Sequence, residues 1–153
     1  MVNEVAQNAR VKLRRITART VRTICNLSVS ESQRKFVAPN AVSIAQACFC
    51  KNAWFRAIYA DETPVGFVML HETPKRGKYY LWRFMIDSKY QGRGYGHKAL
   101  ELVIEHVKKM PKARALTLSA VRAEGSAENL YLEFGFNFTG KIEEGEHAMR
   151  LAV

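Results

Sequence analysis

The chain has 153 residues, of which 48% are hydrophobic and 25% charged, and its formal net charge is +10. This length suits one domain with a sizeable core, and the composition excludes collagen-like, low-complexity and wholly disordered chains. Because the sequence has neither an apolar run long enough to cross a membrane nor the basic and apolar start of a secretory signal, we expect a cytoplasmic protein without a membrane span.

The N-terminal third predicts one strand and two helices. Residues 11–16 alternate apolar and basic side chains, which is typical of a half-exposed strand. A helix is expected next, capped by Thr17 or Thr20. Ser43 and Gln46 have the spacing of a capping box, so a second helix is predicted to begin at Ser43.

The middle of the chain predicts three strands and a long helix. The β-branched and aromatic runs 54–59 and 65–70 flank a turn and form a hairpin, and 79–86 is apolar almost throughout, as in a central strand. From 95 to 109 the apolar residues recur with the period of a helix. Its expected inward positions are Ala99, Leu100, Val103, Ile104 and Val107.

The last segments predict a strand at 116–121, a short helix between Ser126 and Gly135, and a final hairpin. This order indicates an α/β domain with a mixed, mostly antiparallel sheet. The strand at 79–86 and the strand at 116–121 are expected to be parallel neighbours, because a helix connects them by a right-handed crossover.

The distribution of charge and the number of cysteines limit the classes of ligand and partner that the chain is expected to bind. Residues 76–114 carry ten basic and three acidic side chains, a surplus that suits nucleic acid or an anionic cofactor. Helix-turn-helix, zinc-finger and RNP patterns are missing, so we predict no nucleic-acid partner. Cys25, Cys48 and Cys50 are expected to be reduced structural thiols, and no metal is predicted, because neither they nor the histidines have the spacing of metal ligands.

The segment between the central strand and the long helix carries the clearest chemical signal. Gly92, Gly94 and Gly96 occupy alternate positions next to basic residues, immediately before a helix start. Such a turn leaves backbone N–H groups open to an anion, which predicts a phosphate-binding turn. The pattern is neither a Walker A loop nor the dinucleotide G-x-G-x-x-G.

Two motifs in this sequence occur together in one family. Gln91, Gly94 and Gly96 fit the pattern Q/R-x-x-G-x-G/A after the central strand. The pattern A-x-x-L-Y-x-x-x-G-F is matched by Ala127, Leu130, Tyr131, Gly135 and Phe136. The chain therefore resembles, over essentially its whole length, the GNAT superfamily of acyl-CoA-dependent N-acetyltransferases. The resemblance implies one N-acetyltransferase domain over 1–153, with a sheet of six to seven strands, about four helices and a splayed parallel pair at the cofactor site.

The resemblance also implies acetyl-CoA as the acetyl donor. Its pyrophosphate would lie on the amides of 91–98, and its pantetheine arm would pair with 84–86. One departure is Glu124, which stands where the family often has an asparagine. The implied cofactor contacts are Phe84, Met85, Ile86, Gln91, Gly92, Arg93, Gly94, Tyr95, Gly96, His97, Lys98 and Ser126.

Acetyl transfer to an amine requires a neutral nitrogen, whereas an alkylammonium with a pKa of about 10.4 has no free lone pair. A carboxylate is therefore expected to remove a proton, and backbone amides near Ile86 to stabilise the oxyanion. Tyr131 matches the family position that commonly protonates the departing thiolate, and it is the implied catalytic acid.

The sequence says less about the acceptor amine than about the acetyl donor. The stretches 36–40, 81–87 and 90–96 look most similar to bacterial spermine/spermidine acetyltransferases, which implies a small polyamine substrate and, as in relatives, a possible homodimer. The candidate substrate contacts are Glu31, Glu72 and Trp82, with Glu31 and Glu72 also candidates for the base. Alternatives are an aminoglycoside, an amino acid or a protein N-terminus as acceptor, a silent CoA-binding module, or a basic nucleic-acid adaptor.

Overall fold

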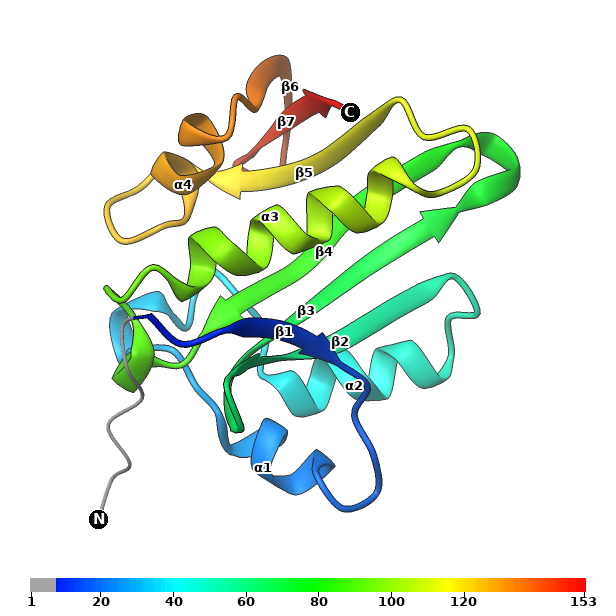
Figure 1. Ribbon diagram of the computed structural model, residues 1–153. Helices are drawn as coiled ribbons and strands as arrows, with labels where there is room; N and C mark the ends of the chain where they lie inside the picture. The colour runs from blue at the N-terminus through cyan, green and yellow to red at the C-terminus, as the bar shows by residue number, and fades with distance from the viewer. Residues whose placement is uncertain (1–7) are drawn as a thin grey trace.

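A seven-stranded mixed sheet, in the order β1-β2-β3-β4-β5-β7-β6, organises the computed structural model (Figure 1). The structure describes residues 8–153, so the start of the chain, where no signal sequence is predicted, lies outside the described residues. The strands are β1 Val11–Arg14, β2 Ala53–Ala60, β3 Thr63–Thr73, β4 Lys78–Ile86, β5 Ala115–Val121, β6 Asn137–Glu143 and β7 Glu146–Ala152. The helices are α1 Val21–Asn26, α2 Asn40–Cys48, α3 Tyr95–Lys108 and α4 Glu128–Glu133, with 3-10 turns at Glu31–Gln33, Pro74–Arg76 and Ser88–Tyr90. The predicted α/β class and mixed sheet are confirmed.

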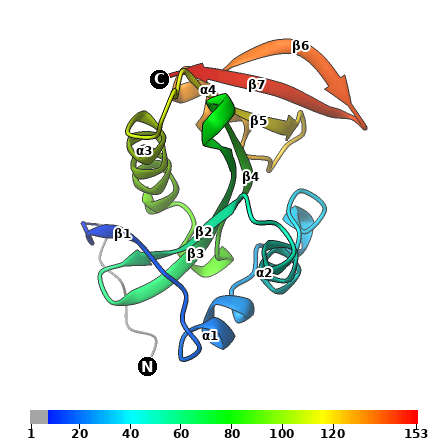
Figure 2. The same ribbon diagram turned by 90° about the vertical axis from the view of Figure 1, so that its right-hand side faces the viewer.

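Different helices cover the two faces of the sheet at β2–β4. Figure 2 shows α3 on one side of β2–β4 and α1 and α2 on the other. Successive side chains of β3 point to opposite faces of the sheet, so this strand contributes to both hydrophobic clusters. Val68 belongs to the core beneath α3, whereas Phe67 and Met69 pack with Ile24 of α1. All the predicted inward positions of α3 are buried, which confirms its amphipathic pattern.

The parallel neighbours β4 and β5 touch only at their beginnings. Their register consists of two pairs, Tyr79 with Leu116 and Tyr80 with Thr117. Beyond these pairs β4 continues along β3, and β5 continues along β7, so the sheet splits into two halves that spread apart (Figure 1). The predicted splayed pair is therefore present, and the backbone of β4 after Tyr80 has a free edge.

The start of α2 differs from the prediction. The helix begins at Asn40 rather than at Ser43, and the Ser43 hydroxyl donates to the Pro39 carbonyl 3.4 Å away, inside the first turn. The expected capping box at Ser43 is therefore wrong. Pro39 has a fixed φ that suits the residue before a helix, and Asn40, only 1% exposed, donates from Nδ2 to the Ile24 carbonyl at 2.9 Å. Burial of this asparagine ties the helix start to α1.

The other predicted elements lie close to the observed ones. The first strand ends at Arg14, two residues early, and α1 follows Thr20, whose hydroxyl accepts from the Thr17 amide at 2.9 Å instead of capping the helix. Ser126 lies one residue before the cap of α4 and accepts from the Glu128 amide at 3.4 Å. Within residues 8–153, the helices are too short or too polar to cross a membrane.

Candidate active site

A cavity of about 780 Å³ opens in the gap between β4 and β5. Its lining comes from β4, from the turn before α3 and the first turn of that helix, from the end of β5, and from α4. The connection between α1 and α2 forms the remaining wall. The lining residues fall within 29–39, 80–86, 90–96, 119–121 and 125–131, together with Glu146 at the start of β7. The free edge of β4 therefore faces this cavity.

Glycines shape the end of the cavity at the start of α3. Gly92 and Gly94 have φ values of 76° and 82°, a left-handed conformation that glycine adopts without steric cost. A Cβ at either position would meet no atom within 4 Å, so both glycines border open space. Gly94 precedes the first residue of α3, and no side chain caps this helix start. The first N–H groups of an uncapped helix and its positive dipole end favour an anion at this end of the cavity.

Polar side chains hold the turn that follows β4. Asp87 is 2% exposed, and its carboxylate accepts from the amides of Lys89 and Ser28, both at 2.9 Å. Gln91 donates from Nε2 to the Ile86 carbonyl at 2.8 Å and to Gln33 Oε1 at 3.0 Å. The motif glutamine thus joins the turn to the end of β4 and to the wall formed by the α1–α2 connection.

The Asp87 carboxylate should contribute strongly to stability. Replacing Asp87 with asparagine weakens two hydrogen bonds to a buried charge, each of which stabilises by about 1.5–3 kcal/mol, and turns an N–H group toward a backbone N–H. We expect the free energy of unfolding in urea to fall by about 2 kcal/mol or more.

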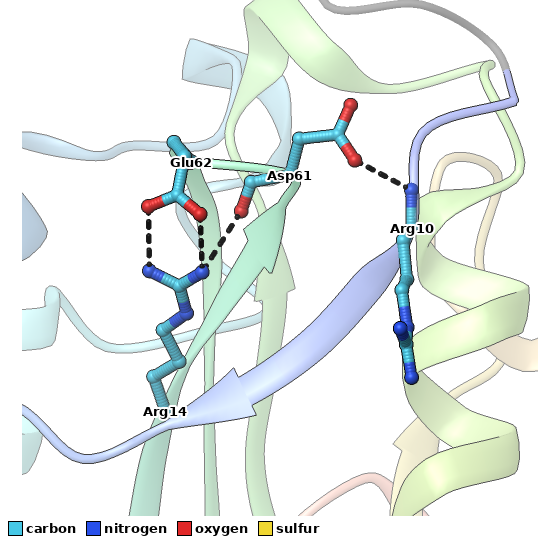
Figure 3. A network of polar contacts seen from close by, with 4 residues as sticks. All are labelled: Arg10, Arg14, Asp61 and Glu62. Atoms are coloured by element: carbon cyan, nitrogen blue, oxygen red, sulfur yellow. Dashed lines mark hydrogen bonds and ion pairs between the residues drawn. The ribbon is translucent and has the colours of Figure 1, made fainter.

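Asp61 provides the matched control for this substitution. Figure 3 shows its carboxylate accepting from the Arg10 amide at 3.0 Å in the exposed β2–β3 turn, beside the two hydrogen bonds from the Arg14 guanidinium to Glu62. Asp61→Asn should lower the unfolding free energy by less than about 0.5 kcal/mol, because surface substitutions of this kind cost little. Equal losses in the two variants would contradict the role of Asp87.

Tyr131 of α4 is the buried phenol of the cavity wall. It is 7% exposed, its ring packs edge-on against Phe136 at 5.7 Å, and it lines the cavity. Burial, with a smaller contribution from Tyr80, raises its pKa above the ordinary value for tyrosine. No hydrogen bond of its hydroxyl occurs among residues 8–153. Tyr131 is therefore a neutral O–H donor that a ligand in the cavity can approach.

Most of the residues predicted for the site lie on this cavity. The structure brings together Trp82, Phe84, Met85, Ile86, Gln91, Gly92, Gly94, Tyr95, Gly96, Ser126 and Tyr131. Three members of the predicted phosphate-binding segment lie beside it instead. The Arg93 guanidinium is 5.9 Å from the Tyr90 ring centre, and Lys98 donates to the Ala9 carbonyl at 3.3 Å. The His97 ring packs 4.5 Å from that of Phe134.

The two predicted substrate carboxylates lie away from the cavity. Glu72 is 8% exposed and lies on the α3 face of β3, where its Oε2 is 2.8 Å from His106 Nε2. The His106 ring stacks on Trp54 at 4.2 Å, which holds the pair in place. Glu31 is exposed in the 3-10 turn and lines no part of the cavity. The structure therefore does not bring Glu31 or Glu72 to the site.

Arg83 and Glu146 also line the cavity, and Arg83 was not predicted there. Leu81 pairs with Leu70 and Arg83 with Met69, so Trp82 is an extra residue on β4. This bulge lets Trp82 and Arg83 both reach the α2 side, whereas strict alternation would send them to opposite faces. A bulge depends on the partner strand, so β4 alone carries no sequence signal for it.

Comparisons with known proteins agree with this geometry. The family model described as "Acetyltransferase (GNAT) family" matches residues 18–136. The spermine/spermidine N(1)-acetyltransferase of Bacillus subtilis (strain 168) is 31% identical over 146 residues, which cover 91% of this chain and 96% of that protein.

Solved structures match the fold over nearly the whole chain. A domain from Methanocaldococcus jannaschii DSM 2661 gives a TM-score of 0.77 at 16% identity, covering 95% of this chain and 100% of that one. A PaiA N-acetyltransferase from Thermoplasma acidophilum, solved in complex with coenzyme A, gives a TM-score of 0.70 at 16% identity, covering 94% and 99%. At these identities the likeness concerns the fold.

Proposed function

Since this chain belongs to the acetyltransferase (GNAT) family, we propose that it uses acetyl-CoA to acetylate a primary amine of a polyamine such as spermidine or spermine. The observation that carries the proposal is the cavity in the β4–β5 gap, which runs from the glycine turn before α3 to the buried phenol of Tyr131. It combines a place for a diphosphate, a free strand edge and a proton donor in one space.

The donor would bind along one wall of this cavity. The amides around Gly94 and Gly96 would bind its diphosphate, because they lie at the uncapped start of α3. The backbone of 84–86 has no strand partner in β5, so the N–H and C=O groups on that edge, other than the Ile86 carbonyl that accepts from Gln91, are available to the amides of a pantetheine arm. When bound, acetyl-CoA supplies a thioester whose carbonyl carbon can be attacked by an amine.

The residues of the cavity would then transfer the protons and stabilise the charge that develops during the reaction. Backbone N–H groups near Ile86 donate to the carbonyl oxygen as it gains negative charge. Tyr131 donates its hydroxyl proton to the departing sulfur. Glu146 is the only carboxylate among the described lining residues, and it accepts the proton of the acceptor ammonium, directly or through water.

The proposed acceptor rests on the relatives and on two cavity residues. The Bacillus subtilis relative is named for spermine and spermidine. Trp82 and Glu146 both line the cavity, and an aromatic ring with a carboxylate suits an alkylammonium chain. The cytoplasmic location, which the sequence predicts, and the homodimer, which the resemblance implies, stay predictions.

Acetyl transfer to an amine panel tests this proposal. Thiol release and mass spectrometry should detect acetylspermidine or acetylspermine. Rapid turnover of other amines, with none of spermidine or spermine, would contradict the polyamine acceptor.

The Glu146→Gln variant tests the assigned carboxylate. It should lower kcat/KM for spermidine by roughly tenfold, because it removes the charge and the proton acceptor nearest the amine. Glu144→Gln is the matched control, since Glu144 is exposed in the same turn and does not line the cavity. An equal effect in both variants would remove Glu146 from the mechanism.

A further inference from the structure

Arg83 is a partly buried cation in the cavity wall without an anionic partner among residues 8–153. Its Nη1 donates to the Trp82 carbonyl and its Nη2 to Gln46 Oε1, both at 3.1 Å. The Nε atom is buried and has no hydrogen-bond partner. The guanidinium is therefore held by two neutral oxygens and lies 5.4 Å from the centre of the Trp82 ring, and two of its five N–H groups are used in these hydrogen bonds.

Burial of a charge without a counter-ion is unfavourable. Removal from water lowers the pKa of Arg83, and the described residues compensate only partly through Tyr80 and Glu146. Proteins usually pair such a group, and guanidinium is suited to a carboxylate because its N–H groups match the two oxygens. An arginine kept unpaired in the wall of a binding cavity is suited to an anionic group on a ligand.

The position of Arg83 indicates which ligand carries that group. Strand residues advance by about 3.3 Å each, so Arg83 lies about 10 Å along β4 from Ile86, and the glycine turn lies beyond Ile86. The diphosphate of the donor would bind at that turn, separated from Arg83 by the pantetheine segment. An anion that binds Arg83 would therefore belong to the acceptor.

The charges around the cavity agree with this assignment. The charged residues of its described lining are Arg34, Lys35, Arg83 and Glu146, which are three cations and one carboxylate. A polyamine can place one ammonium at Glu146, as proposed above, and leaves Arg83 unused. A molecule that carries both an ammonium and a carboxylate would find Glu146 for the first and Arg83 for the second.

We propose that the enzyme also acetylates primary amines that carry a carboxylate, with Arg83 binding the carboxylate. This inference rests on the proposed acetyltransferase function and extends its acceptors to amino-acid-like amines. In the reaction the new nitrogen–carbonyl bond forms as the carbon–sulfur bond breaks. One ammonium proton passes to Glu146 or water before the attack, and the leaving sulfur takes its proton from Tyr131. The nitrogen loses its second proton as the amide forms, and this proton restores the Tyr131 phenol, so that one proton in all is released. Arg83 is a specificity residue that takes no part in proton transfer.

Lysine and cadaverine provide a matched test, because they differ only in the carboxylate, as do ornithine and putrescine. We expect wild-type enzyme with acetyl-CoA to acetylate lysine or ornithine measurably. In Arg83→Met, the ratio of kcat/KM for lysine to that for cadaverine should fall roughly tenfold or more, since a charged hydrogen-bonding partner is lost. Arg83→Lys should restore part of the ratio, because it returns the charge without the paired N–H geometry.

A ratio of two substrates measured on the same preparation is insensitive to partial unfolding of a variant. Binding of lysine to the CoA-saturated protein by calorimetry gives a second readout, which should weaken in Arg83→Met. Transfer to cadaverine but not to lysine or ornithine, or an unchanged ratio in Arg83→Met, would overturn the inference alone. Absence of transfer to every amine would overturn the proposed function and the inference with it.

Discussion

Replacing Gly94 with valine should raise KM for acetyl-CoA by roughly 100-fold or more. The added side chain would enter the open space of the cavity at the uncapped start of α3, where we propose that the diphosphate binds. Loss of one or two hydrogen bonds to a charged group, each worth about 1.5–3 kcal/mol, corresponds to roughly 10- to 1,000-fold in affinity or more. Steady-state kinetics with varied acetyl-CoA provide the measurement.

Gly140 separates this effect from backbone strain. Its φ of 90° is close to that of Gly94, a Cβ there would also meet no atom within 4 Å, and it lies in β6 outside the cavity lining. Gly140→Val therefore carries a similar conformational cost without entering the cavity. Similar KM values for Gly94→Val and Gly140→Val would contradict a diphosphate site at Gly94.

The Tyr131→Phe variant should lower kcat by roughly 100-fold or more, because general acid catalysis typically contributes about 10²- to 10⁴-fold. The phenyl ring keeps the packing against Phe136, so the dissociation constant for CoA should change little. Tyr80 also lines the cavity, and its phenol influences that of Tyr131. A large kcat loss in Tyr80→Phe, with normal turnover in Tyr131→Phe, would assign the acid to Tyr80.

The pH dependence provides a second check on Tyr131. An acid must be protonated to donate, and burial raises the pKa of Tyr131 above the ordinary phenol value of about 10. The reactive neutral form is therefore retained as pH rises toward about 10, and deprotonation of Tyr131 should not lower kcat in that range. A decline in kcat well below that pH that disappears in Tyr131→Phe would contradict the raised pKa.

Local patterns were sufficient to predict the elements that form the proposed cofactor side of the cavity. The helical period of α3 and the alternate glycines before it depend on near neighbours in the chain, and both occur as expected. The parallel pair of β4 and β5 followed from the helix between them. The family motifs placed Gln91, Gly94 and Tyr131 on one cavity.

The acceptor side could not be predicted in the same way, because it depends on contacts between distant segments. The bulge at Trp82 is set by pairing with β3, and it is what brings Arg83 to the α2 side. Glu72 alternates onto the α3 face and pairs with His106. The start of α2 at Asn40 depends on burial against α1, which no capping pattern records.

The amide spectrum of nitrogen-15-labelled protein during titration with CoA tests the central claim most directly. We expect saturable changes concentrated at 91–98 and at 84–86, where the diphosphate and the pantetheine arm would contact the backbone. Changes confined to other parts of the fold, or a spectrum of folded protein that CoA leaves unaltered, would contradict a donor site in the β4–β5 gap.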